Sequence, residues 1–230
     1  MILVFTIAVI GCDNGVTNNS SGITLVCFGD SLTAGYGAGG ILTLKEDKSK
    51  SYPAYLQKKV NAHNVHVVNA GVSGDTTAQG LARVDRDVLS KNPQIVIILL
   101  GANDFLKPIL DRNSTNTIPV NETQANLQSI INKVNNGNRK IYLAKFYTHK
   151  MIEDSPILSP LIDPAVIAGY DAMFDVLAAS SNNVTLINDI WTGVWGIWPV
   201  SPTMSDPIHP NALGYEIMAG HFYNALKPYL

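Results

Sequence analysis

The feature of this chain that most constrains its fold is a regular alternation of short apolar runs with amphipathic segments. The runs are rich in β-branched residues and lie at 23–28, 65–69, 95–100, 141–144 and 184–187. Such nearly continuous apolar runs are typical of strands that are buried on both faces of a parallel sheet. Segments with helical spacing of apolar residues lie near 52–62, 77–90, 127–134, 164–180 and 211–227. This order predicts an α/β three-layer sandwich, with a five-stranded parallel sheet between two layers of helices.

Length, charge and cysteine content narrow the class of protein further. A chain of 230 residues is expected to form one folded domain. It has 16 Lys and Arg residues against 18 Asp and Glu residues, a formal net charge of −2, and no basic block that would neutralise a nucleic-acid backbone. The two cysteines, Cys12 and Cys27, lack the spacing of a zinc site or of a disulfide framework. We therefore expect neither a nucleic-acid partner nor a structural metal.

The first ten residues are apolar except for Thr6, and the run is about half as long as a bilayer-spanning helix. It ends at Gly11 and Cys12, and residues 9–12 resemble the lipobox of bacterial lipoproteins, in which the cysteine is lipidated and becomes the first mature residue. Residues 1–11 are then a signal peptide, 12–22 a small and polar tether, and 23–230 the folded domain. This interpretation predicts an exported lipoprotein, periplasmic or on the cell surface, that contacts the membrane through its anchor. The run lacks the Lys or Arg of an ordinary signal peptide, so a buried first strand is the alternative.

Polar and glycine-rich motifs follow the predicted strands. They are Gly29-Asp30-Ser31-Leu32, Asn69-Ala70-Gly71-Val72-Ser73-Gly74, Gly101-Ala102-Asn103-Asp104 and Asp206-Pro207-Ile208-His209. In open α/β sheets, ligands bind in the loops at the carboxyl ends of the strands. The sequence therefore predicts that these four motifs form one site.

Three of these residues have the side chains of a Ser-His-Asp triad. A serine hydroxyl becomes nucleophilic when a histidine accepts its proton, and a carboxylate fixes the tautomer of that histidine. Ser31, His209 and Asp206 supply the three groups. Acyl transfer by such a triad also needs hydrogen-bond donors for the oxyanion, and Gly71 and Asn103 are candidates for them.

The four motifs, in this order, resemble those of the GDSL or SGNH hydrolases, a family named for the Ser, Gly, Asn and His of its four blocks. The resemblance extends from the first predicted strand to the carboxyl end. It implies a flavodoxin-like sheet, with Ser31 as nucleophile, His209 as base and Asp206 as the residue that orients the base. It also implies an oxyanion hole made of the Ser31 N–H, the Gly71 N–H and the Asn103 side chain.

Within this family, residues 29–36 are most similar to the lysophospholipase/thioesterase I branch, whose members are single-domain bacterial esterases of acyl esters. Residues 37–50 form an insertion that departs from the compact pattern of that branch, so they leave the substrate preference open. Within 35–40 the spacing G-x-G-x-x-G begins seven residues after the strand, and no helical pattern follows. We interpret it as a mobile loop rather than a dinucleotide site. The α/β-hydrolase pattern G-x-S-x-G fails because Thr33 occupies its last position.

All three tryptophans of the chain, Trp191, Trp195 and Trp198, follow the last predicted strand. They either pack against the core or the insertion, or they line the site as an apolar surface for an acyl chain or an aromatic alcohol. We expect the polar segment Leu106–Val120 to be an irregular loop that lines the opposite side.

Other polar residues near the motifs have simpler interpretations. Asp30 and Asp104 are expected to bind loop backbone rather than to take part in the chemistry. The remaining histidines have no carboxylate at a comparable sequence spacing, so we interpret them as surface or helix residues; they are His63, His66, His149 and His221.

Together these features predict a serine esterase without cofactor or metal, which hydrolyses carboxylic esters or thioesters through an acyl-enzyme. A lysophospholipid or a short-acyl ester is the expected substrate. A carbohydrate O-acetylesterase of the cell envelope is the alternative enzyme. A surface lipoprotein that binds glycans or lipids without catalysis is a third interpretation, against which the intact Ser31, Asn103 and His209 argue.

Overall fold

The protein has the predicted α/β fold, with five strands in one sheet. A computed structural model describes residues 22–230 except 41, 111–117, 157 and 161. The strands are all parallel and pair in the order β2-β1-β3-β4-β5. Their bounds are β1 Ile23–Gly29, β2 Val65–Gly71, β3 Ile95–Leu99, β4 Lys140–Ala144 and β5 Val184–Ile187. The prediction of a five-stranded parallel sheet is confirmed.

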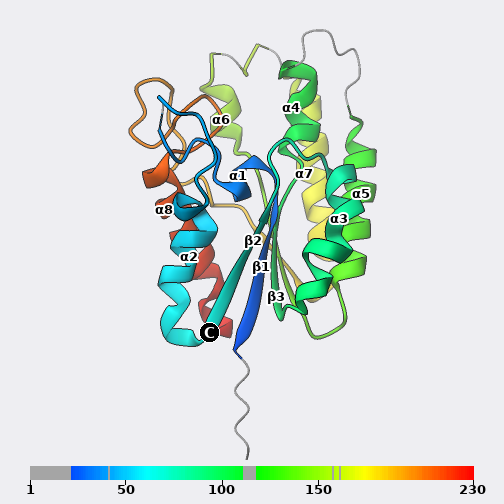
Figure 1. Cartoon of the computed structure of the whole chain (residues 1–230). Helices are drawn as coiled ribbons and strands as arrows, with labels where there is room; N and C mark the ends of the chain where they lie inside the picture. Colours follow the sequence, from blue (N-terminus) through cyan, green and yellow to red (C-terminus); the bar gives the residue numbers. More distant parts are fainter. Residues whose placement is uncertain (1–21, 41, 111–117, 157, 161) are drawn as a thin grey trace, which may run out of the picture.

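Helices cover both faces of the sheet and complete three layers (Figure 1). The five long helices are α2 Tyr52–Val60, α3 Thr77–Asp87, α5 Val120–Val134, α7 Pro164–Ala179 and α8 Ala212–Leu226. Helices α2 and α8 pack together on one face, and α5 packs between α3 and α7 on the other. Further helices begin near the carboxyl ends of the strands: α1 Ser31–Ala34, α4 Ala102–Leu110 and α6 His149–Glu153. One-turn 3-10 helices lie at 48–50, 61–63, 89–91 and 227–229.

Burial along the strands follows their place in the sheet. Strand β3 is fully buried, and β1 is buried from Leu25 onward, because both lie inside the sheet and are covered by helices on two faces. Strands β2 and β5 lie at the edges and are partly exposed, with His66 facing solvent. The expectation of burial on both faces therefore holds for the inner strands only.

Two segments differ from the expected loops. Within the predicted irregular loop Leu106–Val120, residues 106–110 continue helix α4, and residues 111–117 lie outside the described part of the chain. Helix α4 forms there because Phe105 and Leu106 pack into the core one turn after Ala102. The predicted mobile loop at 35–40 is instead held from two sides, which contradicts that interpretation: its Gly37 N–H donates to Lys45 O at 3.1 Å, and Gly37 O accepts from the Ser205 hydroxyl at 2.6 Å.

The predicted signal peptide 1–11 and residues 12–21 of the predicted tether, with the candidate lipidation residue Cys12, lie outside the described residues. In the part of the chain that the structure describes, no helix combines the length and the hydropathy needed to cross a bilayer. Cys27 is buried in β1, and this burial raises the pKa of its thiol well above the usual value. A thiol in such surroundings is chemically inert.

Candidate active site

The chain turns sharply from β1 into α1, and this turn presents Ser31 at the carboxyl edge of the sheet. Asp30 is the only residue between the strand and the helix, and its Oδ1 accepts the Leu32 N–H at 3.0 Å, as an N-cap does. Gly29 permits the turn, because a Cβ at this position would lie 2.2 Å from Leu99 O. Ser31 is therefore the first residue of a short helix whose start is fixed by its neighbours.

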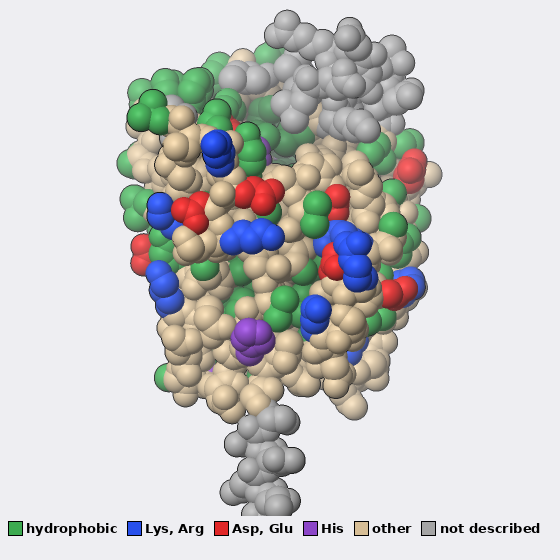
Figure 2. Space-filling model, in the orientation of Figure 1, with side chains coloured by type: hydrophobic (Ala, Val, Ile, Leu, Met, Phe, Trp, Pro, Cys, Tyr) green, Lys and Arg blue, Asp and Glu red, His purple; other side chains and the backbone are tan. Residues whose placement is uncertain are grey.

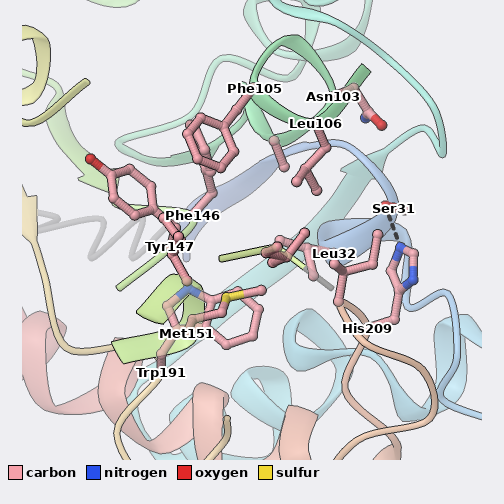
Figure 3. A pocket seen from close by; sticks show the side chains of 14 residues that line it. Ser31, Leu32, Asn103, Phe105, Leu106, Phe146, Tyr147, Met151, Trp191 and His209 are labelled. Atoms are coloured by element: carbon pink, nitrogen blue, oxygen red, sulfur yellow. Dashed lines mark hydrogen bonds between the residues drawn. The ribbon is translucent and has the colours of Figure 1, made fainter. Parts of the chain in front are cut away.

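A continuous hydrogen-bond chain joins Ser31, His209 and Asp206, although 178 residues separate the first two. The Ser31 Oγ lies 3.0 Å from His209 Nε2 (Figure 3). His209 Nδ1 lies 2.7 Å from Asp206 Oδ2. The other oxygen of Asp206 accepts the backbone N–H groups of Ile208 and His209 at 2.8 and 2.7 Å. With Nδ1–H donated to the carboxylate, Nε2 is the ring nitrogen that can accept the serine proton.

The surroundings of the imidazole favour this arrangement. Burial by itself would raise the pKa of Asp206, but its hydrogen bonds with His209 and with the loop backbone outweigh burial and lower that pKa. Asp206 is therefore ionised at neutral pH. The ring of Tyr36 packs against the His209 ring with the centroids 4.7 Å apart, which limits rotation of the imidazole.

Of the two candidate oxyanion donors beyond Ser31, the structure supports Asn103 and argues against Gly71. Asn103 is in the first turn of α4, lines the same pocket as Ser31, and donates one Nδ2–H to Asp75 O at 2.9 Å, which leaves its second N–H free to donate. Gly71 ends β2, and its N–H already donates to Asn69 Oδ1 at 2.9 Å. Its missing side chain serves packing, since a Cβ there would lie 2.2 Å from Ala34 N.

Gly74 is a further candidate backbone donor that the sequence motifs did not single out. It lies in the turn that follows β2, which is closed by a hydrogen bond from Asp75 N–H to Val72 O. Its φ of +84° is favourable only for glycine, and a Cβ there would meet open space. No hydrogen bond of the Gly74 N–H is found among the described residues. Because Asn103 donates to the carbonyl of Asp75, the residue after Gly74, Asn103 lies close to the turn that contains Gly74.

A solvent-open pocket extends from Ser31, and the space between its lining side chains, open solvent included, is about 440 Å³. Its lining is predominantly apolar: Leu32, Ala102, Phe105, Leu106, Phe146, Tyr147, Met151, Ile152, Leu158, Trp191 and Ile208 surround Ser31, Asn103 and His209. Most of these residues come from α4, α6 and the segment after β4, and sequence reasoning missed them apart from Leu106 and Trp191. Hydrophobic side chains also gather on the surface at this end of the molecule (Figure 2).

The three tryptophans do not act as one surface. Trp191 is buried and lines the pocket beside Ser31. Trp195 and Trp198 line a separate, smaller hollow together with Pro156 and Pro207. The predicted substrate surface is thus divided, and only Trp191 reaches the candidate active site.

The remaining histidines are surface or helix residues, as expected: His149 is exposed on α6 and His221 belongs to α8. His63 and His66 are exposed, as predicted. His149 Nε2 lies 2.5 Å from Asp171 Oδ2, and His221 Nδ1 lies 3.3 Å from an Asp189 oxygen, so both have carboxylate partners from other parts of the chain. None of these pairs includes a serine. Within the described ranges no three His, Cys, Asp or Glu side chains are arranged to bind a metal ion.

Asp30 and Asp104 bind backbone, as predicted. Asp104 Oδ2 accepts the Thr77 N–H at 2.8 Å and joins α4 to the start of α3. Asp30 is fully buried, and its Oδ2 has no hydrogen-bond partner among the described residues. The pKa of Asp30 is therefore raised to about 7, chiefly by burial and in smaller part by the nearby Asp104 charge, against the opposing effects of the Leu32 N–H and of His209.

The Asp30→Asn variant is expected to be more stable than the wild type above pH 7. Between pH 4 and 7 the unfolded chain ionises Asp30 but the folded protein does not, so the free energy of unfolding of the wild type falls as pH rises. The asparagine is neutral and still accepts the Leu32 N–H. The advantage of the variant should therefore grow from pH 4 to pH 7, up to about 4 kcal/mol at ~1.4 kcal/mol per pKa unit. Urea unfolding of both proteins across this range measures it, and parallel pH profiles would contradict the burial argument.

Comparisons with known proteins identify the family of the chain. The GDSL-like Lipase/Acylhydrolase family model matches residues 27–217. Esterase TesA of Pseudomonas aeruginosa is 28% identical over 217 residues, covering 94% of this chain and 93% of that protein. Thioesterase 1/protease 1/lysophospholipase L1 of Escherichia coli is 37% identical over 95 residues, 41% of each protein. Acetylxylan esterase of Geobacillus stearothermophilus is 31% identical over 123 residues, 48% of this chain and 53% of that protein.

A solved structure extends the agreement to the fold. The crystal structure of TesA matches with a TM-score of 0.70 and 27% identity, covering 90% of this chain and 99% of that one. The family resemblance predicted from the four motifs is confirmed. The chain belongs to the GDSL-like lipase/acylhydrolase family, and it is an ester-hydrolysing serine hydrolase.

Proposed function

We propose that this enzyme hydrolyses esters or thioesters of apolar acyl groups, lysophospholipids among them, through an acyl-enzyme at Ser31. The observation that carries the proposal is the position of the Ser31–His209–Asp206 chain at one end of a pocket that is apolar elsewhere. Polar groups near Ser31 act on the ester, while apolar side chains accept the acyl chain.

In the proposed mechanism, the Ser31 Oγ attacks the acyl carbon while its proton passes to His209 Nε2. The negative charge on the former carbonyl oxygen is stabilised by the N–H groups of Ser31 and Gly74 and by the Asn103 amide. As the oxygen or sulfur of the leaving group departs, it takes the proton from Nε2, and the acyl group stays on Ser31. A water molecule then gives a proton to His209 Nε2 and attacks the acyl carbon; as the bond between that carbon and Ser31 Oγ breaks, Nε2 returns the proton to Oγ and the acid is released. Gly74 replaces Gly71 in this scheme because the Gly71 N–H is already bound.

The proposed acyl site consists of the pocket side chains beyond the triad. Phe105, Met151, Ile152 and Trp191 offer apolar surface there. Burial of each methylene of an acyl chain contributes about 0.8 kcal/mol, so chains that extend along this surface should be favoured over acetyl.

A series of p-nitrophenyl esters from acetate to palmitate tests this proposal, together with a lysophospholipid and an acetylated sugar. We expect kcat/KM to rise from acetate to chains of intermediate length, and the lysophospholipid to be hydrolysed. Preference for acetate and for the acetylated sugar would contradict it and would support the second candidate. That candidate, a carbohydrate O-acetylesterase, is favoured by the similarity to an acetylxylan esterase.

The Asn103→Ala variant is expected to lose about 10²–10³-fold in kcat, or 2.7–4 kcal/mol, with little change in KM. The reason is that an oxyanion donor acts mainly when charge has formed on the oxygen of the transition state. Steady-state kinetics on the best ester of the series measures both constants. A change confined to KM would instead assign Asn103 to substrate binding.

We also propose that Cys12 is lipidated and that the protein is exported and anchored at the periplasmic or outer cell surface, on the basis of residues 9–12. Fractionation of native cells should find the full-length protein in membranes, and Cys12→Ser should accumulate unprocessed or mislocalised. Recovery of soluble protein with an intact Met1 end would contradict this proposal.

A further inference from the structure

Arg83 on α3 is a buried arginine that touches two of the turns on which the active site depends. Its side chain is 7% exposed and packs over the Phe28 ring, with the guanidinium carbon 4.4 Å from the ring centroid. We propose that Arg83 is a positioning residue, which fixes the nucleophile turn of Ser31 relative to the turn of Gly74 that carries the oxyanion donor. The inference rests on the roles proposed above for those turns.

The first set of contacts reaches the ends of two strands. Arg83 Nη2 donates to Gly29 O at 2.8 Å, two residues before Ser31. Arg83 Nη1 donates to Ala70 O at 2.8 Å, near the end of β2. The guanidinium thus binds the last part of β1 and of β2 where each strand leads into its active-site turn.

The second set of contacts reaches residues 72–75, the turn that contains Gly74, which we call the oxyanion turn. Arg83 Nε donates to Asp75 Oδ2 at 2.5 Å, and Nη1 also donates to Asp87 Oδ2 at 3.2 Å. The backbone carbonyl of Asp75 accepts the Asn103 amide, and Gly74 precedes Asp75. Through Asp75, Arg83 is therefore linked to both proposed donors.

This geometry matters because an oxyanion hole works only when its donors lie about 3 Å from the developing charge, and displacements of about 1 Å can cost on the order of 10²-fold in rate. The planar guanidinium donates in several fixed directions at once. A lysine at position 83 keeps the charge but offers one nitrogen, which cannot reproduce bonds from three nitrogens to Gly29, Ala70 and Asp75. Charge alone would not preserve the separation of the two turns.

The test compares Arg83→Lys and Arg83→Met with the matched control Arg86→Ala. Arg86 is on the same helix and also binds Asp87, but it is exposed and contacts neither turn. Active sites are titrated with a p-nitrophenyl phosphonate, so that kcat refers to folded, reactive enzyme. We expect Arg83→Lys to lower kcat by about 10–100-fold with KM within about twofold, Arg83→Met to lower kcat at least as much, and Arg86→Ala to match the wild type.

A second measurement separates positioning from a merely structural role. If Arg83 acts through the oxyanion turn, Arg83→Lys should cost less in the Asn103→Ala background than in the wild type, because one of the two donors that it positions is already absent. Equal losses in the two backgrounds would overturn the proposal, as would an unchanged kcat per titrated site in Arg83→Lys. If Arg83→Met does not fold, Arg83→Lys carries the test. Failure of the proposed function itself is distinguishable, since it would appear as an unimpaired Ser31→Ala or Asn103→Ala enzyme before Arg83 is changed.

Discussion

The Ser31→Ala variant is expected to lose ester hydrolysis, with kcat lower by on the order of 10⁶-fold, as in serine hydrolases whose nucleophile has been removed. The substitution removes the oxygen that attacks the substrate and leaves His209 without the proton that it must accept. The rest of the turn is unaffected, because its backbone bonds are made by Asp30 and Gly35 rather than by the Ser31 hydroxyl. Hydrolysis of a p-nitrophenyl ester by the purified variant measures the loss.

Ser129→Ala is a suitable control for this experiment. Ser129 lies on the exposed side of α5, and its hydroxyl binds only the Ala125 carbonyl of its own helix. This variant should keep wild-type activity. Retention of more than a few per cent of wild-type kcat by Ser31→Ala, at an unchanged melting temperature, would rule out Ser31 as the nucleophile.

The Asp206→Asn variant is expected to lose about 10⁴-fold in kcat. An asparagine can donate its amide N–H to His209 Nδ1, which moves the ring proton to Nε2 and leaves no acceptor for the serine proton. The backbone N–H groups of Ile208 and His209 keep an oxygen acceptor in the variant, so the loop should stay folded. Steady-state kinetics and thermal unfolding, measured together, separate the loss of rate from any loss of stability.

A second His–Asp pair provides a matched control for Asp206. Asp189 lies 3.3 Å from His221 Nδ1, but neither residue contacts Ser31. Asp189→Asn should therefore leave kcat unchanged. If Asp206→Asn keeps a kcat close to that of the wild type, Asp206 stabilises its turn and does not orient His209 for catalysis.

Local sequence pattern and the topology of a parallel sheet are sufficient to predict the strands, the long helices and the triad. Apolar runs and helical spacing locate all five strands and the long helices. The rule that loops meet at the carboxyl edge of a parallel sheet then brings Ser31 and His209 together across 178 residues. Asp206 and His209 are three residues apart, so one turn is sufficient to pair them.

The choice of oxyanion glycine could not be made from sequence pattern alone. Gly71 and Gly74 lie in one short motif, and both follow an apolar run. What distinguishes them is the direction of the N–H group: that of Gly71 is bound to Asn69, whereas Gly74 has the positive φ of a turn beyond the strand. Gly71 pairs with Gly29 as the last residues of β2 and β1, so Gly71 still belongs to the sheet, whereas Gly74 lies in the turn beyond it. The sequence does not show where the strand ends.

The lining of the pocket was equally hard to predict, because it is assembled from segments that are distant in the sequence. Phe105 belongs to α4, Phe146 to the segment after β4, and Met151 to α6. The polar residues after 110 obscured the amphipathic pattern of α4. His149 and Asp171 are 22 residues apart, and only the packing of α6 near α7 makes them partners. These residues are not related by any regular sequence spacing, so a sequence pattern does not predict their contacts.

The central claim is that Ser31 forms a covalent bond to the group that the enzyme transfers to water. A p-nitrophenyl phosphonate that carries an alkyl chain tests it most directly, because the adduct is stable and intact-protein and peptide mass spectrometry locate it. We predict one phosphonyl group per chain on the peptide that contains Ser31, p-nitrophenol released in equal amount, and no adduct in Ser31→Ala. Complete inactivation with the adduct on another residue, or with no adduct at all, would contradict the account.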